Sequence, residues 1–119
     1  MNELEAEFGA KVMLELGSLP HCRLWRNPVG AVRNVDGRYL SFGLARGGAD
    51  YIGIYRGLFL SIETKQVRGK TQGERRKQQI AWRDMVNSQG GIAVIAYGDL
   101  EALTEELEEL YQGRVNERK

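Results

Sequence analysis

A continuous apolar run near the end of the chain places the strongest limit on its fold. The run IAVIAYG begins at Ile92, directly after a pair of glycines. It has the length of a strand, and a strand without polar alternation is typically covered on both of its faces. Residues 74–89 precede it with a helical pattern, and Asp99 follows it as a good N-cap for a last helix that ends near Tyr111. The sequence therefore predicts a sheet that is flanked by helices.

The first part of the chain predicts one more helix and four strands. Apolar residues at helical spacing run from Leu4 to Leu16 and indicate an amphipathic helix over residues 3–17, which Gly17 and Pro20 end. Short segments bounded by turn residues then indicate strands at about 22–27, 38–43, 50–55 and 58–65. The expected order is helix, four strands, helix, strand, helix, which is an α/β fold.

The length of 119 residues suits one compact domain. We expect this domain to span residues 1–112 and to be followed by a flexible tail over residues 113–119. No run approaches the roughly 18 apolar residues of a membrane span, and the acidic N-terminus does not resemble a signal peptide. We therefore expect an intracellular, cytoplasmic protein without a membrane partner. Cys22 is the only cysteine, which excludes an internal disulfide and indicates a reduced, partly buried thiol.

The net charge of +1 hides a segregation of charge along the chain. From Asp99 to Glu109 there are six acids and no base. Between residues 65 and 83, Glu74 is the only acid among the basic residues Lys65, Arg68, Lys70, Arg75, Arg76, Lys77 and Arg83. One interpretation is a strongly positive face of the molecule. The other is a solvated helix face, which is the more common meaning of a charge run taken alone.

The segment ADYIGIYRGLFLSIETKQ, residues 49–66, reads as a hairpin with charges at both ends. If Arg56 and Gly57 form a two-residue turn, counting back along both strands places Asp50 opposite Glu63. Lys65 then lies beside them, because residues two apart on a strand share a face. The opposite face is apolar and suits packing against a helix, with Tyr51, Tyr55, Leu58, Leu60 and Ile62.

Two opposed carboxylates destabilise a sheet unless a cation compensates for them. Lys65 supplies part of the positive charge, and a divalent ion such as Mg²⁺ suits the oxygen ligands. Such an ion with a nearby lysine is chemistry for cutting a phosphodiester bond. The alternative is an ordinary surface salt bridge between Lys65 and one of the acids, which these three residues alone favour.

Asp50 with the SIETKQ segment resembles the signature of the PD-(D/E)XK nucleases, with Ala49 where the family name has proline. The further segments RNPVG, GGAD, QIAW and GGIAVIA follow in an order and spacing that resemble the VRR-NUC family, the virus-type replication-repair branch of that superfamily. The similarity spans about residues 5–103. It implies a restriction-endonuclease-like core with a mixed central sheet and a DNA nuclease that uses Mg²⁺ or Mn²⁺. A viral origin is left open.

Short stand-alone members of this family resemble Holliday-junction resolvases and act as homodimers on branched DNA. The resemblance therefore implies a structure-selective endonuclease with branched DNA as its partner. Two alternatives stay open: a nuclease that acts on flaps, ends or duplex DNA, and an inactive DNA-binding module that keeps the fold.

The resemblance also assigns roles to residues of this chain. Asp50 and Glu63 are the expected metal ligands, with the carbonyl of Thr64 as a third, and Lys65 is the expected catalytic lysine. Gln79 is expected to reach the site from its helix. A glutamate of the first helix completes the site in the family, and Glu5 fits this position best, although Glu3 and Glu7 are close to it.

Basic and polar residues near these motifs are candidates for DNA contact. They are Arg26, Asn27, Arg46, Arg68, Lys70, Arg75, Arg76 and Lys77, and a solvated surface is the equal alternative for each. Trp25 and Trp82 are expected to be core or half-buried packing residues rather than platforms on which bases stack. His21 has no partner at catalytic spacing, so we expect it to be structural.

Overall fold

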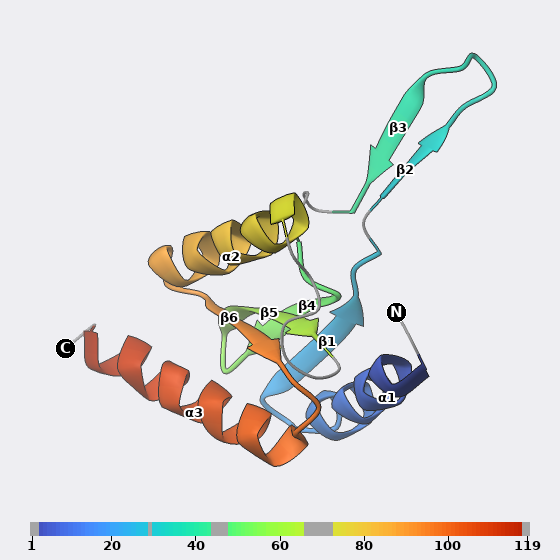
Figure 1. Ribbon diagram of the computed structural model, residues 1–119. Coiled ribbons are helices and arrows are strands. Elements are labelled where there is room, and N and C mark those ends of the chain that lie inside the picture. The colour runs from blue at the N-terminus through green and yellow to red at the C-terminus, as the bar shows by residue number, and fades with distance from the viewer. Residues whose placement is uncertain (1–2, 29, 44–47, 66–72, 118–119) are drawn as a thin grey trace.

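The computed structural model describes residues 3–28, 30–43, 48–65 and 73–117 (Figure 1). In chain order its elements are α1 (Glu3–Gly17), β1 (Cys22–Arg26), β2 (Gly30–Arg33), β3 (Tyr39–Phe42), β4 (Tyr51–Tyr55), β5 (Leu58–Thr64), α2 (Gly73–Ser88), β6 (Ile92–Ala96) and α3 (Leu100–Glu117). No helix in this part of the chain is long and apolar enough to cross a bilayer.

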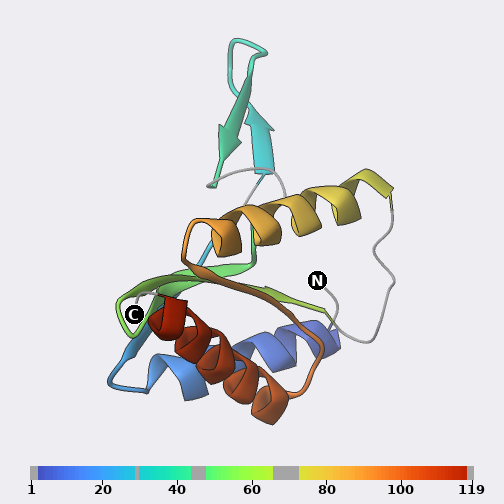
Figure 2. The ribbon, with the colours of Figure 1, turned by 90° about the vertical axis from the view of Figure 1, so that its left-hand side faces the viewer.

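Four strands form a central sheet in the order β1-β4-β5-β6. Strand β4 runs antiparallel to both β1 and β5, whereas β6 runs parallel to β5. Helix α2 covers one face of this sheet, and α1 and α3 cover the other (Figures 1 and 2). The expected mixed sheet between helices is therefore confirmed.

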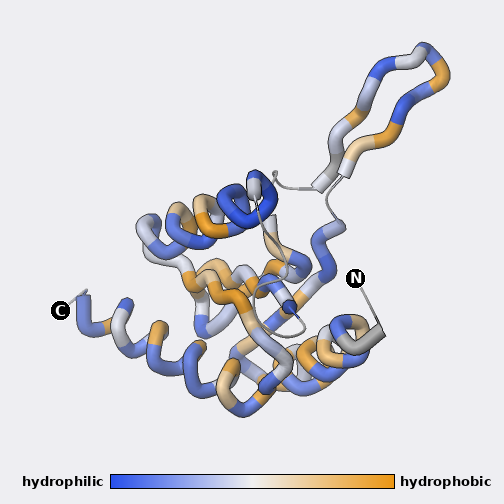
Figure 3. Tube along the Cα trace, in the orientation of Figure 1, coloured by the Kyte–Doolittle hydropathy of each residue, from blue (hydrophilic) through white to orange (hydrophobic). Residues whose placement is uncertain are grey.

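The core lies between the central sheet and the helices α1 and α3. Its fully buried apolar residues include Val12 and Leu16 of α1, Leu60 and Ile62 of β5, and Leu107 of α3. Figure 3 shows the apolar residues concentrated on the strands of the central sheet. The run that predicted a doubly covered strand is β6, and all of its residues except the partly buried Ile95 are buried.

The β4–β5 hairpin has the register that the sequence predicts. Arg56 and Gly57 form its turn with φ angles of +48° and +87°. Positive φ at both central residues is the geometry of the turn that matches the twist of paired strands. Tyr55 pairs with Leu58 and Tyr51 pairs with Ile62, so the tyrosines and their neighbours face the core as expected.

A further strand, β2, is present where the sequence predicted none. It pairs with β3 in a separate two-stranded sheet, and Gly30 lies opposite Phe42 at its base. The turn is closed by the side chain of Asn34, whose Oδ1 accepts hydrogen bonds from the backbone N–H groups of Asp36 and Arg38. The predicted order with four strands before α2 was therefore wrong by one strand.

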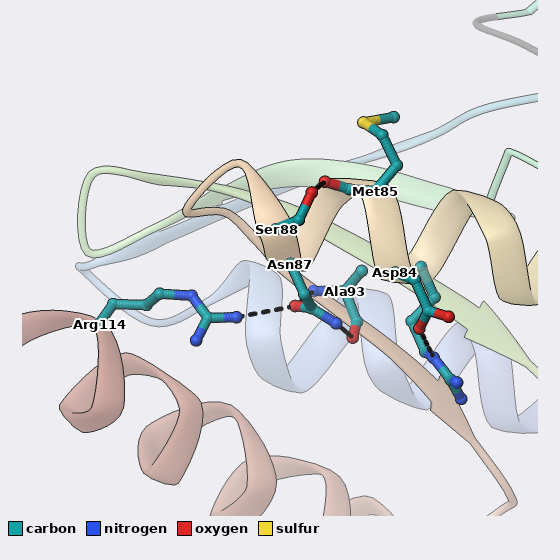
Figure 4. A network of polar contacts seen from close by, with 7 residues as sticks. Asp84, Met85, Asn87, Ser88, Ala93 and Arg114 are labelled. Atoms are coloured by element: carbon teal, nitrogen blue, oxygen red, sulfur yellow. Dashed lines mark hydrogen bonds and ion pairs between the residues drawn. The ribbon is translucent and has the colours of Figure 1, made fainter. Parts of the chain in front are cut away.

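Helix α3 continues to Glu117, so residues 113–117 are not the flexible tail that was expected. Arg114 holds this end in place, because its Nη2 donates to Asn87 Oδ1 at 3.1 Å (Figure 4). Its Nε also donates to the Gly91 carbonyl at 3.0 Å. The Asn87 amide also bonds both the N–H and the carbonyl of Ala93. The Asn87 side chain therefore satisfies the backbone groups that a neighbouring strand would otherwise bond at the outer edge of β6.

Candidate active site

Asp50 and Glu63 come together at one end of the central sheet. Asp50 lies directly before β4, and Glu63 is the penultimate residue of β5. Because Tyr51 pairs with Ile62, the next step of the same register places Asp50 opposite Glu63. The negative charge of Asp50 also helps to raise the pKa of Glu63, as expected for two neighbouring carboxylates. The register and this electrostatic interaction agree with the predicted proximity of the two acids, and their sharing of one ion stays a prediction.

Hydrogen bonds fix Asp50 in place although it follows alanine rather than proline. Its Oδ2 accepts bonds from the backbone N–H and the Oγ1 hydroxyl of Thr64, at 3.0 and 2.9 Å. Its carbonyl accepts a bond from the Asn27 N–H at 2.8 Å. Both bonds to the carboxylate use Oδ2, which leaves Oδ1 as the oxygen for a ligand.

Asn27 has a structural role in place of the DNA contact that was expected. Its side chain is buried, and its Nδ2 donates to the carbonyl of Ala49 at 3.0 Å. Together with the backbone bond to Asp50, this contact anchors the segment that enters β4. A buried amide with a backbone partner is not available to a phosphate group.

Glu63 is a buried carboxylate with two polar neighbours. Its Oε1 accepts a hydrogen bond from Gln79 Nε2 at 3.0 Å and lies 3.4 Å from Lys65 Nζ. Burial and the charge of Asp50 raise its pKa to about 7, although Lys65 and Arg75 act in the opposite direction. The charged form of Glu63 is therefore disfavoured unless another cation joins the site.

Gln79 reaches the site from α2, as expected, and carries an unsatisfied atom. Its side chain is only 4% exposed, and its Oε1 accepts no hydrogen bond from the described residues. A buried carbonyl oxygen without a donor is rare in native proteins. The orphan oxygen lies on the amide that bonds Glu63, so it indicates a missing partner at this site.

These residues fit a divalent metal ion. In the part of the chain that the structure describes, no three acidic, histidine or cysteine side chains form a metal-binding group. An ion here would be held by the carboxylates of Asp50 and Glu63 and completed by neutral oxygens such as Gln79 Oε1 and water. Mg²⁺ takes one or two carboxylates and keeps several waters, so this donor set suits it.

The backbone carbonyl of Thr64 is directed towards β4, the strand that Asp50 directly precedes. Lys65 donates its backbone N–H to the carbonyl of Ala96 on β6. Because successive residues of a strand turn their backbone groups to opposite neighbours, Thr64 directs its groups towards β4. The orientation is compatible with the role as a third ligand that was expected for this carbonyl.

Ser61 and Trp82 form a contact that the sequence reasoning missed. Trp82 Nε1 donates to Ser61 Oγ at 2.8 Å, two residues before Glu63 on the same face of β5. Gln79 and Trp82 are three residues apart and lie on one face of α2. The spacing of these two residues in the QIAW segment was the sequence signal that could have placed both side chains on the same side of the site. Trp82 is half-buried as expected, whereas Trp25 is 54% exposed and is therefore less covered than the expected core or half-buried position.

Glu5 lies in the first turns of α1 and is partly buried. One turn later, α1 passes so close to β4 that a β-carbon on Gly9 would lie 2.2 Å from the Tyr51 hydroxyl oxygen. The part that Glu5 plays in the site stays a prediction, as do the alternatives Glu3 and Glu7.

The basic residues of α2 begin beside the site. Arg75 is exposed, and its charge lowers the pKa of Glu63. Arg76 donates to the Tyr97 hydroxyl at 3.2 Å, and Lys77 lies 3.7 Å from Glu74. Arg26 is exposed at the end of β1. The other predicted DNA contacts lie outside the described residues, namely Arg46, Arg68 and Lys70.

A comparison with protein-family models found none that matches this chain. A comparison with curated proteins found no similar sequence. The resemblance to the VRR-NUC nucleases therefore rests on the residues of the chain itself.

The variant Glu63→Gln tests the electrostatics of the site without DNA or metal. Burial raises the pKa of Glu63 from its usual 4.5 to about 7, so between these values the folded chain holds a proton that the unfolded chain has lost. The free energy of unfolding of the wild type, relative to Glu63→Gln, should therefore fall as the pH rises through this window. The expected total is roughly 2–3 kcal/mol.

Urea unfolding between pH 4.5 and pH 8 with a chelator measures this difference. Glu105→Gln removes an exposed carboxylate of α3 and is the matched control, which should follow the wild type. Identical pH profiles for the wild type and Glu63→Gln would contradict the perturbed carboxylate.

Proposed function

We propose that this chain is a metal-dependent nuclease that hydrolyses phosphodiester bonds of DNA. The observation that carries the proposal is the buried Glu63 carboxylate, whose pKa the charge of Asp50 raises and whose bonded partner Gln79 carries an orphan oxygen. Two acids and an unsatisfied acceptor form a site whose negative charge Lys65 compensates only in part. The resemblance to the VRR-NUC family, which these same residues help to carry, points to the same conclusion.

Each residue at the site has a distinct task in this proposal. A bound Mg²⁺ or Mn²⁺ supplies Lewis-acid chemistry and a water that loses its proton more readily. Asp50 and Glu63 hold the ion, and Gln79 orients the Glu63 carboxylate through its amide. Lys65 lies beside Glu63 with a largely buried ammonium group, where it stabilises negative charge that develops on the phosphate.

The proposed substrate is branched DNA, such as a four-way junction, and the proposed active form is a homodimer. Arg75 and Arg76 adjoin the site at the start of α2, where they suit contacts to the DNA backbone. A two-fold dimer presents two such sites to two symmetry-related strands. The preference for branched over flap or duplex DNA rests on the family resemblance alone.

An inactive DNA-binding module is the second candidate. The buried Glu63 argues against it, because placing this acid near the partly buried Asp50 costs stability that a binding surface has no reason to accept. The basic residues would serve such a module without the acids.

The variants Asp50→Asn and Glu63→Gln should reduce cleavage by about 100-fold or more, because each weakens a metal ligand. Asp50→Asn keeps an oxygen that can accept the bonds from Thr64. A panel of four-way junction, flap, single-stranded and duplex DNA with Mg²⁺, Mn²⁺ or chelator measures the effect. Asp84→Asn, an exposed position of α2, is the control and should cleave normally. Cleavage that persists in chelator, or in both site variants, would contradict the proposal.

Replacing Arg75 and Arg76 by glutamine should flatten the salt dependence of DNA binding. Each lost phosphate contact lowers the slope of log K against log salt by about 0.9 on duplex DNA. Fluorescence anisotropy in chelator measures the slope, and Lys11→Gln on the other side of the sheet is the matched control. An unchanged slope would exclude these arginines from phosphate contact.

A further inference from the structure

Tyr97 lies beside the candidate active site, although the sequence predicted no role for it. The strands β5 and β6 are parallel, and the backbone N–H of Lys65 donates to the carbonyl of Ala96 at 2.7 Å. Because Thr64 pairs with Ala96, the next step of the same register places Tyr97 beside Lys65. Neighbouring strands lie about 4.8 Å apart, which makes these two residues direct neighbours.

Tyr97 also lies on the face of the sheet that carries the site. Glu63 pairs with Ile95, and residues two apart on a strand lie on one face, so Tyr97 shares the face of Glu63. Helix α2 covers this face and bonds Glu63 through Gln79 and Tyr97 through Arg76. The site therefore continues from the ends of β4 and β5 to the end of β6, next to the start of α2 (Figure 2).

The side chain of Tyr97 is accessible and anchored. It is 38% exposed, and Arg76 Nη1 donates to its hydroxyl at 3.2 Å. In the described part of the chain, no other ring and no guanidinium lies over the Tyr97 ring. Directly after it, Gly98 turns the chain with a φ of +75°, and the Asp99 carboxylate caps α3 by accepting a bond from the Ala102 N–H. An exposed aromatic ring is thus held beside the site.

We propose that the ring of Tyr97 stacks on the base of the nucleotide that flanks the phosphate to be cut. The inference rests on the proposed function, in which Lys65 contacts this phosphate. A DNA strand that leaves Lys65 towards β6 then passes over Tyr97. Arg76 keeps donors for the adjacent phosphate, because a guanidinium has five N–H groups and one of them binds the hydroxyl.

This contact gives the site a preference for one class of DNA. Stacking on an aromatic ring tolerates any base, so the contact reads no sequence. A base can reach the ring only after it has left the stack of its own duplex, and this step costs least where the nucleotide is already unpaired. The ring of Tyr97 therefore favours DNA with an unpaired nucleotide beside the cut, as at a branch point, over a continuous duplex.

An abasic-site scan combined with variants of Tyr97 tests the contact. Four-way junctions that each lack one base along a strand are compared in binding, by fluorescence anisotropy in chelator, and in cleavage with Mn²⁺. With the wild type, loss of the base at one nucleotide that flanks the cut should weaken binding about 10-fold. Tyr97→Leu should bind the intact junction about 10-fold more weakly and should not respond to loss of that base, because its partner ring is gone.

Two further variants separate the ring from the hydroxyl and from general effects. Tyr97→Phe keeps the ring, so it should keep most of the affinity and the sensitivity to the missing base. Tyr39→Leu removes another exposed tyrosine whose hydroxyl binds an arginine, on the β2–β3 hairpin. It is the matched control and should respond to the same missing base as the wild type does. Circular dichroism confirms that each variant is folded.

The outcomes distinguish this inference from the proposed function. A wild type without any base-sensitive nucleotide, a sensitive nucleotide away from the cut, or a Tyr97→Leu variant that keeps the wild-type sensitivity would overturn the inference. A Tyr97→Phe variant that loses the sensitivity as fully as Tyr97→Leu does would also overturn it and assign the contact to the hydroxyl. A base-sensitive wild type that cleaves no DNA with either metal would contradict the proposed function but support the stacking contact.

Discussion

The site depends on one constraint, which is the burial of the Glu63 carboxylate close to the partly buried Asp50. Burial and like charge both oppose ionisation of Glu63, and the nearby Lys65 only partly compensates. The surrounding contacts hold the acids in this position. Thr64 binds the Asp50 carboxylate, and the amide of Gln79 binds Glu63. The architecture thus maintains a local concentration of negative charge that a divalent cation would relieve.

The parts of the fold that could be predicted from sequence are those with local signals. The turn at Arg56 and Gly57 determines the strand register. Counting along this register predicts that Asp50 and Glu63 lie close together, and the count needs no knowledge of the tertiary structure. Helix α2 was also predicted from a local signal, namely its helical pattern and the glycines that end it. Gln79 was placed through the family resemblance, and the structure brings it to the acid that the resemblance implied.

The features that were missed depend on contacts between distant segments. The end of α3 contains Gly113 and charged residues, which read as a frayed tail, but the bonds of Arg114 to the segment before β6 keep it helical. Strand β2 follows turn residues, and none of its residues is buried. Its sequence therefore shows no clear alternation of apolar and polar residues. Trp25 lies on the part of the sheet that no helix covers, and Asn27 is buried with its amide bonded to the Ala49 carbonyl. Neither environment can be read from the local sequence.

The most direct test of the account is calorimetric titration of the DNA-free protein with Mn²⁺ and Mg²⁺. The account predicts saturable binding to the wild type, with release of protons near pH 7, because Glu63 must ionise when it becomes a ligand. Asp50→Asn and Glu63→Gln should each weaken binding at least about 10-fold, and Gln79→Leu by a similar factor. A wild-type protein that binds neither ion, or variants that bind both as tightly as the wild type does, would contradict the account.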